Sequence, residues 1–347
     1  MQRRPIVIAH RGASGERPEH TLAAYELAIE QRADFIEPDL VMTSDGVLVA
    51  RHEPYLGGDN PDFAGADTTD VAGHPNFAGR KRTVTIDGVR LTGWFACDFT
   101  LTELKTLRAR ERLPQLRPGN TAYDGRFEVP TLAEIIALAR AAEARTGRAI
   151  GIYPETKHPS WHASLGLPME AALVRQLHAA GYDRQRERVF IQSFEVGNLN
   201  ALRAMTPIPL VQLMGDDTEQ PADFAIAGDH RTYADLATPE GLRAVAAYAT
   251  AVGPSKARVL AVGSDGTPRD TGFARAAHAA GLKVHPWTFR AENQFLPPAL
   301  RRGTDPAAHG DLTAELQAAF AAGVDGVFAD FPATAVAARD QALQSVG

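Results

Sequence analysis

Short runs of apolar, β-branched residues alternate with stretches of helical periodicity along nearly the whole chain, and this alternation limits the possible folds more than any other feature. Such runs, bounded by turn residues, predict buried strands, and apolar residues repeated every three or four positions predict amphipathic helices. The predicted strands lie near residues 6, 36, 48, 151, 190, 211, 284 and 326. The predicted helices cover residues 21–32, 131–145, 168–180, 195–205, 239–250, 272–280, 312–322 and 332–344.

This pattern predicts an α/β fold, namely a (β/α)₈ barrel of the TIM type that takes up residues 1–347 as a single domain. Strands that alternate with helices form a parallel sheet with the helices outside it. Eight such strands can close into a barrel. A chain of 347 residues with 44% hydrophobic content is long and apolar enough to bury the core of that barrel.

Two regions depart from the regular alternation. The strands near residues 36 and 48 are joined by too short a turn for a parallel crossover, so they form either a hairpin or a local irregularity. Residues 53–99 hold many turn residues and little helical periodicity, which predicts a subdomain inserted after the third strand, over the mouth of the site. Whether residues 251–261 contain another strand stays open.

Glu37 and Asp39 lie two positions apart on a predicted strand. Side chains at this spacing point to the same face of a strand, with their Cα atoms about 6.6 Å apart. At an effective dielectric constant near 20, two such anions repel each other by roughly 2.5 kcal/mol. A divalent cation would reverse the sign of that energy, because Mg²⁺ and Ca²⁺ take oxygen ligands. The alternative is an edge strand with both carboxylates in water.

Two histidines each stand where a predicted strand ends. His10 follows the apolar run 5–9 and precedes a glycine-containing loop, and His52 follows the apolar run 47–50. A single histidine in such a place is more often a core residue, but two around an acidic strand indicate proton transfer at neutral pH. Arg11 offers a planar guanidinium that matches phosphate oxygens. The combination favours chemistry on a phosphate ester.

Glu155 and Lys157 follow the predicted strand near residue 151. Glu155 would be a third oxygen ligand for the cation, and Lys157 a positive partner for a phosphate or for the acids. The alternative is a surface ion pair. All the candidate residues fall at the carboxyl ends of their strands, which is the end that carries the chemistry in (β/α)₈ enzymes.

Together these segments resemble the motifs of the glycerophosphodiester phosphodiesterase family, and the wider pattern is similar to its longer bacterial, periplasmic-type branch. The most specific matches are residues 10–15 (HRGASG), 18–21 (PEHT), 37–40 (EPDL), 45–46 (DG), 52–53 (HE) and 153–157 (YPETK). Weaker matches are residues 192–194 (QSF), 285–288 (HPWT) and 327–332 (VFADFP). Pro38 between the two acids and Thr156, where the family often has an aliphatic residue, are minor departures that remove no functional atom.

The resemblance implies hydrolysis of glycerophosphodiesters to glycerol 3-phosphate and an alcohol. Glu37, Asp39 and Glu155 would hold one divalent cation, Ca²⁺ or Mg²⁺. His10 and His52 would exchange protons with the attacking and leaving oxygens, with His10 preferred as the base and His52 as the acid. The resemblance also implies that the attacking group is the substrate's own neighbouring glycerol hydroxyl. The residues expected to bind the substrate are Arg11, Glu53, Lys157, Phe194 and Trp287.

Three other functions are compatible with this set of residues. Related barrels with a similar site act on lysophospholipids or sphingomyelin, and an exposed apolar rim would favour that function. Phospholipases C specific for phosphatidylinositol also use two histidines in such a barrel, but the acidic residues favour a metal-dependent relative. A barrel that only binds phosphodiesters would need no pair of proton-transferring histidines.

The formal net charge of −6 argues against a nucleic-acid partner, which would favour a basic face. The single cysteine, Cys97, excludes a disulfide within the chain. No apolar run reaches the roughly 18 residues of a membrane span. Residues 1–5 leave no room for a signal peptide as numbered, so we expect a cytoplasmic protein, or a periplasmic or secreted one if a leader was removed. The sequence does not indicate an oligomeric state.

Overall fold

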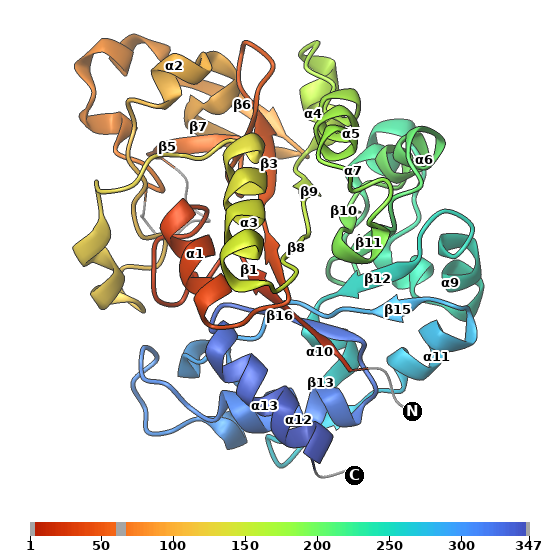
Figure 1. The fold of residues 1–347 in the computed structure, drawn as a ribbon. Helices are drawn as coiled ribbons and strands as arrows, with labels where there is room; N and C mark the ends of the chain where they lie inside the picture. Colours follow the sequence, from red (N-terminus) through yellow and green to blue (C-terminus); the bar gives the residue numbers. More distant parts are fainter. Residues whose placement is uncertain (1–3, 60–66, 345–347) are drawn as a thin grey trace.

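Parallel strands close into a barrel with helices around it in the computed structural model, which describes residues 4–59 and 67–344 (Figure 1). The barrel strands are β1 (Ile6–His10), β2 (Phe35–Glu37) with β3 (Asp39–Met42), β8 (Gly151–Ile152) with β9 (Glu155–Thr156), β10 (Ile191–Ser193), β11 (Leu210–Met214), β12 (Ala251–Pro254), β15 (Lys283–Val284) and β16 (Gly326–Ala329). Hydrogen bonds from Asp325 N to Val284 O (2.9 Å) and from Phe328 N to Pro286 O (3.1 Å) join β16 to the β15 side. The predicted α/β barrel is therefore confirmed.

Two of the eight positions in the barrel are filled by strands that a proline interrupts. Pro38 separates β2 from β3, and Pro154 lies between β8 and β9. Proline has no N–H to donate to a strand ladder, so the regular pairing breaks there. The pairing resumes beyond each break, since β2 pairs with β8 and β3 pairs with β9. The register places Asp39 opposite Glu155.

One predicted barrel strand is corrected by the structure. β4 (Leu48–Ala50), the strand predicted near residue 48, runs antiparallel to β3 and lies outside the ring. The reason is the short turn between them, which can form a hairpin but cannot carry a crossover. The eighth position in the ring belongs to β12, in the region that the sequence left open, where it pairs with β11 and β15.

All eight predicted helices are present, seven with small shifts at their ends, while the helix predicted over residues 239–250 ends five residues early, at Val245. They are α1 (Leu22–Glu30), α3 (Leu132–Thr146), α5 (Glu170–Ala179), α6 (Val196–Met205), α9 (Pro239–Val245), α11 (Phe273–Ala279), α12 (Leu312–Ala321) and α13 (Pro332–Gln344). The limits of α3 have clear local causes. The Thr131 side chain accepts from the Glu134 N–H, and the Glu134 carboxylate accepts from the Thr131 N–H. Gly147 ends α3 at φ 66°, a left-handed conformation that favours glycine.

Shorter elements connect these parts. The short helices are α2 (Leu101–Leu104), α4 (Pro159–Ser164), α7 (Ala222–Ala227), α8 (Tyr233–Leu236) and α10 (Lys256–Val259). The 3₁₀ turns are η1 (Val71–Gly73), η2 (Pro75–Arg80), η3 (Ala96–Asp98), η4 (Pro118–Tyr123), η5 (Arg186–Arg188), η6 (Asn293–Phe295) and η7 (Pro298–Leu300). β13 (Leu260–Val262) and β14 (Pro268–Asp270) form a separate hairpin. Among the described helices, none has the length and apolar character that a bilayer crossing would need.

The barrel interior changes from apolar to polar along its strands. Ile8, Phe35 and Phe328 belong to one buried cluster. Since side chains two positions apart share a face of a strand, His10 follows Ile8 on that face and Glu37 follows Phe35. In the same way Asp330, the residue after β16, follows Phe328 on that face. A packed apolar floor thus lies beneath the polar residues at the carboxyl ends of the strands.

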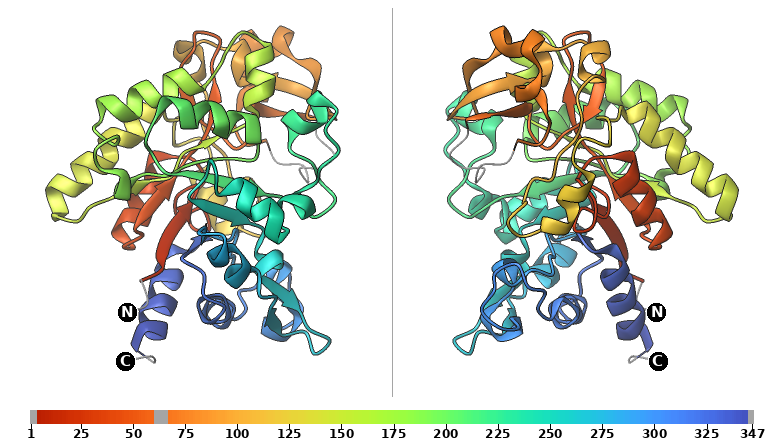
Figure 2. Two further views of the ribbon diagram at one scale, coloured as in Figure 1. Left: turned by 90° about the vertical axis from the view of Figure 1, so that its right-hand side faces the viewer. Right: turned by 90° about the vertical axis from the view of Figure 1, so that its left-hand side faces the viewer.

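A small antiparallel sheet lies within the predicted insertion and is built from β5 (Tyr55–Asp59), β7 (Val89–Phe95) and β6 (Arg82–Ile86). Figure 2 shows this sheet, in orange, at the opposite end of the molecule from the two termini. It has its own apolar cluster, which includes Tyr55 and Phe95. A second cluster, with Trp94 and Phe99, connects the sheet to Val41 of β3. The helix alternation of the barrel does not resume until α3, so residues 100–130 are a further irregular segment that the sequence left unassigned.

Candidate active site

One cavity of about 1170 Å³ is lined by residues from the carboxyl ends of the barrel strands. All ten residues that the sequence predicted for the site lie on its wall: His10, Arg11, Glu37, Asp39, His52, Glu53, Glu155, Lys157, Phe194 and Trp287. The structure therefore brings them together, while their chemical roles stay predictions. The end of the barrel at which they meet is the end that carries the chemistry in this architecture.

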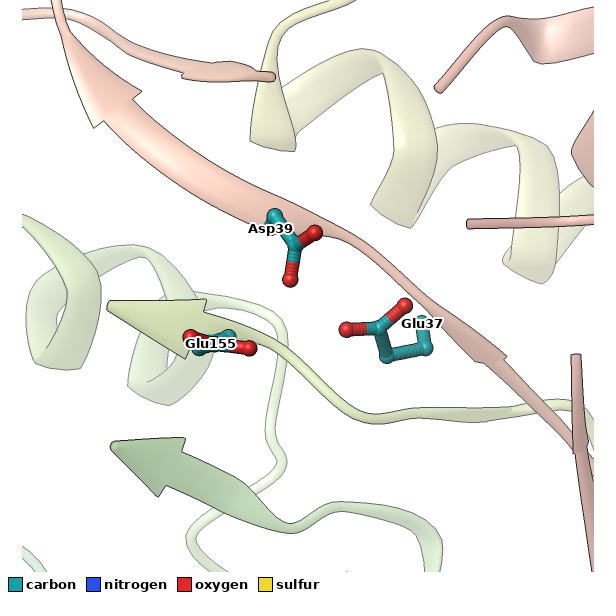
Figure 3. Close-up of side chains that lie close together, drawn as sticks. All are labelled: Glu37, Asp39 and Glu155. Carbon is teal, nitrogen blue, oxygen red and sulfur yellow. The ribbon is translucent and has the colours of Figure 1, made fainter. Parts of the chain in front are cut away.

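Three of these residues form an acidic cluster, Glu37, Asp39 and Glu155. Their carboxylates converge on one point between β3 and β9 (Figure 3), and one oxygen of each lies within 4.8 Å of the others. All three side chains are buried. Carboxylate oxygens can accept hydrogen bonds but cannot donate them when ionised, so they do not satisfy one another.

The acidic cluster fits a hard divalent cation. Asp39 Oδ1 is buried and finds no hydrogen-bond donor among the described residues. Ca²⁺ and Mg²⁺ bind oxygen ligands at about 2.0–2.6 Å, and three carboxylates this close together could share one such ion. Lys157 pairs with Glu155 and Arg11 lies beside Asp39, but three carboxylates exceed these two positive charges, so a cation between the carboxylates would balance the charge of the cluster.

The pKa values of the three acids are shifted in different directions, because the three carboxyl groups are buried close together. Burial, followed by the Asp39 charge, raises the pKa of Glu37 well above its usual value. Burial also raises the pKa of Glu155 to about 8, although Lys157 opposes the rise. Burial disfavours the ionised form of Asp39 too, but His20 and Lys157 outweigh it and hold the pKa of Asp39 well below its usual value.

Neighbouring groups fix the orientation of the acids. Glu37 accepts from the Arg11 N–H through one oxygen (2.8 Å) and from Gln192 Nε2 through the other (2.9 Å). His20 Nε2 lies 3.0 Å from Asp39 Oδ2. The backbone of Arg11 is left-handed at φ 60°, and this conformation accompanies the contact of its N–H with Glu37. These contacts hold the carboxylates in place without filling the space between them.

His10 is paired with a carboxylate from the last strand of the barrel. Its Nδ1 lies 2.7 Å from Oδ1 of Asp330, which directly follows β16. The other oxygen of Asp330 accepts from Arg117 Nη2 (2.5 Å) and Arg290 Nε (3.0 Å). Burial and, after it, the Arg11 charge lower the pKa of His10 to about 4, so the ring is neutral at pH 7.

His52 is paired with the carboxylate of the next residue. Its Nδ1 contacts Glu53 Oε1, and its Nε2 lies 3.3 Å from Lys157 Nζ. Lys157 also forms an ion pair of 2.9 Å with Glu155, so it links His52 to the acidic cluster. Burial and then the Arg11 charge lower the pKa of His52 well below its usual value. Both histidines are thus neutral rings, each with a carboxylate on Nδ1.

Arg11 belongs to an ionic chain that reaches the insertion. Its Nη1 donates to Glu19 (2.8 Å), and its Nε lies 3.3 Å from Asp39. Glu19 also accepts from Arg112 Nε (2.8 Å). Arg112 in turn donates to both oxygens of Glu53, at 2.9 and 2.6 Å. Glu53 therefore faces His52 and Arg112 with both of its oxygens.

Aromatic side chains form the outer walls of the cavity. Phe194 and Trp287 meet edge to face with ring centroids 5.8 Å apart, and the Trp287 indole N–H donates to Gly253 O (2.8 Å). Farther out, the cavity wall includes the β6–β7 turn, α4 and α7. Val89 and Ile226 lie on this outer wall, and their exposed fractions of 45% and 72% make the rim partly apolar.

Four residues were not predicted for the site, namely Asp330, Gln192 and Arg112, which contact predicted residues, and Arg117, which contacts Asp330. Asp330 and Gln192 had a signal, because both belong to strand-end segments that resemble the family. Arg112 and Arg117 had none, since they lie in residues 100–130, where no periodicity or motif marks them. Their contacts join positions that are distant in the sequence, such as Arg117 and Asp330.

Comparisons with known proteins agree with this geometry. A model of the glycerophosphoryl diester phosphodiesterase family matches residues 10–334. A glycerophosphodiester phosphodiesterase of Arabidopsis thaliana is 37% identical over 340 residues, covering 94% of this chain and 84% of its own length.

Solved structures share the fold. A crystal structure from Silicibacter pomeroyi, described as a glycerophosphoryl diester phosphodiesterase, has a TM-score of 0.65 at 22% identity and covers 98% of this chain and 95% of its own. An Oleispira antarctica phosphodiesterase, solved in complex with the product sn-glycerol-3-phosphate, has a TM-score of 0.55 at 21% identity and covers 97% of each chain. The resemblance predicted from the sequence is confirmed, and the chain belongs to the glycerophosphoryl diester phosphodiesterase family of enzymes.

Proposed function

We propose that this chain hydrolyses glycerophosphodiesters to glycerol 3-phosphate and an alcohol, using one divalent cation and two histidines. The observation that carries the proposal is a single cavity whose wall holds three converging carboxylates and two carboxylate-paired histidines. The Oleispira antarctica structure with sn-glycerol-3-phosphate supports the product class. A site that only bound a phosphodiester would have no use for two neutral, oriented imidazoles.

Glu37, Asp39 and Glu155 would hold the cation, either Ca²⁺ or Mg²⁺. When bound, it would neutralise negative charge on the phosphate oxygens as that charge builds up in the transition state. Arg11 and Lys157 border the same space and would add positive charge there. Lys157 already neutralises part of the acidic cluster through its ion pair with Glu155.

The two histidines would move the protons. In this proposal His10 takes a proton from the attacking hydroxyl at Nε2. His52 gives a proton to the leaving oxygen from Nε2 in its doubly protonated form, and it takes that proton up from solvent before the bond to the leaving oxygen breaks. Both functions need a ring held in one orientation, which the contacts on Nδ1 provide. Glu53 would orient His52, since its Oε1 contacts His52 Nδ1, and its Oε2, which accepts from Arg112, could also accept from a substrate hydroxyl. Phe194 and Trp287 would pack against the carbons of the glycerol or the alcohol.

The test is release of glycerol 3-phosphate from several glycerophosphodiesters, with added Ca²⁺ or Mg²⁺ and with a chelator. We expect His10→Asn and His52→Asn each to lower kcat by about 10²–10⁴-fold, the usual range for an acid or base. His278→Asn is the matched control, because His278 is a half-exposed histidine paired with Asp325 and is not part of the cavity wall. No product with any headgroup, despite added cation, would refute the proposed function.

The cation assignment has a separate test. Glu37→Gln removes one charge from the acidic cluster while keeping its shape, so we expect a large loss of cation affinity and little change in the free energy of unfolding. Titration calorimetry with Ca²⁺ and Mg²⁺, beside urea unfolding of the metal-free protein, measures the two quantities. Equal losses in both would indicate a structural ion.

A second candidate substrate class has one observation in its favour. The exposed Val89 and Ile226 give the outer cavity an apolar rim, and the cavity is larger than a glycerophosphate group needs. A lysophospholipid or sphingomyelin would place its chain there. Comparing kcat/KM for glycerophosphocholine and for lysophosphatidylcholines of increasing chain length separates the classes, since only a lipid substrate gains from Val89 and Ile226.

A further inference from the structure

Both histidines of the site are supported in the same way by one short piece of chain. Asp330 contacts His10 and is held by Arg117, while Glu53 contacts His52 and is held by Arg112. The two arginines are five residues apart in the irregular segment that precedes α3. In each case the histidine Nδ1 contacts a carboxylate, and that carboxylate accepts hydrogen bonds from an arginine.

The Arg117 side chain is placed by three partners. Besides Asp330, its Nε donates to Glu292 (2.6 Å) and its Nη1 donates to Ser14 O (2.9 Å). Arg117 and Glu292 are both buried. Burial opposes ionisation of Asp330, but Arg117 and Arg290 hold the pKa of Asp330 well below its usual value. Asp330 is therefore an acceptor, and His10 must donate to it from Nδ1, which leaves Nε2 unprotonated in the neutral ring.

The His52 side has an independent sign of the same tautomer. Lys157 Nζ, an ammonium that can only donate, lies 3.3 Å from Nε2 of His52. Nε2 must then be the acceptor, so the ring proton is on Nδ1 and points to Glu53. Arg112 binds Glu53 through two parallel N–H donors, a fork that fixes the plane of the carboxylate.

We propose that Arg112 and Arg117 are positioning residues for the proposed reaction: each locks the carboxylate that keeps one histidine in the tautomer with its proton on Nδ1. This inference rests on the proposed function for the identity of the reaction, but the tautomers themselves can be observed without substrate. For His10, the base, the wrong tautomer would turn a proton donor toward the position where the ring must accept a proton. For His52, the acid, a proton fixed on Nδ1 leaves Nε2 as the nitrogen that takes up and gives the transferred proton.

The experiment combines kinetics with ¹⁵N NMR of histidine-labelled protein, applied to wild type, Arg117→Gln and Arg112→Gln. In the wild type we expect both rings to carry the proton on Nδ1. Arg117→Gln should lose this preference at His10 and keep it at His52, and Arg112→Gln should do the reverse. Removal of such indirect support typically costs about 10–100-fold, so we expect kcat to fall by that factor while KM stays within about threefold.

A buried arginine elsewhere provides the matched control. Arg339 is fully buried and donates to Asp34 and Asp340, away from the cavity wall. Arg339→Gln should lower stability and leave kcat and both tautomers as in the wild type. If a glutamine variant does not fold, Arg117→Lys and Arg112→Lys carry the same comparison, because lysine keeps the charge and loses the fork.

Two results would overturn the inference: wild-type kcat and tautomers in both variants, or equal changes at both histidines whichever arginine is replaced. The second result would mean that the arginines only support the fold. Failure of the proposed function looks different, because wild-type protein would then release no glycerol 3-phosphate while its ring tautomers could still be assigned.

Discussion

The two histidines of the cavity differ in the strands that position them and in the origin of their carboxylate partners. His10 ends β1, which pairs with β16 on one side and with β2 on the other, and its carboxylate partner comes from the end of β16. His52 follows β4, an antiparallel strand outside the ring, and its partner is the next residue, Glu53. The His10 side chain is 10% exposed and that of His52 is 27% exposed.

This difference separates what the barrel supplies from what the insertion supplies. The His10 pair is set by the register of two neighbouring barrel strands. The His52 pair is set where the chain leaves the barrel for the small sheet of β5–β7. One proton-transfer group is therefore tied to the rigid scaffold, and the other to the part of the chain that can vary without disturbing the barrel.

The largest effect that tests this comparison comes from neutralising the two carboxylates. Asp330→Asn removes a carboxylate charge that Arg117 and Arg290 share and leaves Arg117 with Glu292, whereas Glu53→Gln removes the partner of one arginine and leaves Arg112 with Glu19. We expect Asp330→Asn to lower kcat by about 10³–10⁴-fold, as for a misplaced tautomer, and to cost about 3–5 kcal/mol of stability. For Glu53→Gln we expect a smaller loss in both quantities. Steady-state kinetics and urea unfolding measure them, and equal losses would show that the two supports are equivalent.

Much of the barrel, and ten of the residues that line the cavity, could be predicted because their sequence signals are local. The apolar runs and helical periodicity marked seven of the eight barrel strands and the eight longer helices, but not the five short helices of the described chain. Glu37 and Asp39, at i and i+2 beside a proline, were recognisable within a few residues. The exception was the strand near residue 48, where the pattern of a buried strand is the same inside and outside the ring.

The residues that hold the cavity-lining residues in place could not be predicted, because their role depends on contacts between distant parts of the chain. Arg117 reaches Asp330 across 213 positions, and nothing near Arg117 in the sequence marks it as part of a site. An arginine in a polar loop is usually a solvated surface residue. Its role depends on how residues 100–130 pack over the barrel end, which no local pattern specifies.

A smaller effect concerns Glu111, a buried residue of the segment that supports both histidines. It accepts from Leu113 N (2.8 Å) and Asn120 Nδ2 (2.9 Å). Burial raises the pKa of Glu111 to about 7, although Arg117 opposes the rise. The unfolded chain releases this proton near pH 4.3, so the folded state binds it more tightly and stability falls as pH rises from about 4.3 to about 7.

Glu111→Gln removes that titration. We expect the free energy of unfolding of the wild type to fall by about 3 kcal/mol more than that of the variant between pH 4.5 and pH 8, from about 1.4 kcal/mol per pKa unit. Urea midpoints at several pH values measure the difference. Parallel curves for the two proteins would mean that Glu111 is ionised in the folded state across the whole range.

The smallest effect is a difference in local opening between the two supports. β1 is enclosed by strands on both sides, and its residues Val7, Ile8 and Ala9 are fully buried. The small sheet has three strands and its own apolar cluster, which includes Tyr55 and Phe95, so it can open while the barrel stays closed. By hydrogen exchange under native conditions we expect the amides of β7 to exchange at least about tenfold faster than those of β1, which corresponds to about 1.4 kcal/mol. Phe95→Ala, which removes a fully buried ring of the sheet's own cluster, should speed exchange in β7 and leave β1 unchanged. If β1 and β7 exchange at one common rate in both proteins, the insertion unfolds only with the barrel, and the two histidines do not stand on separable supports.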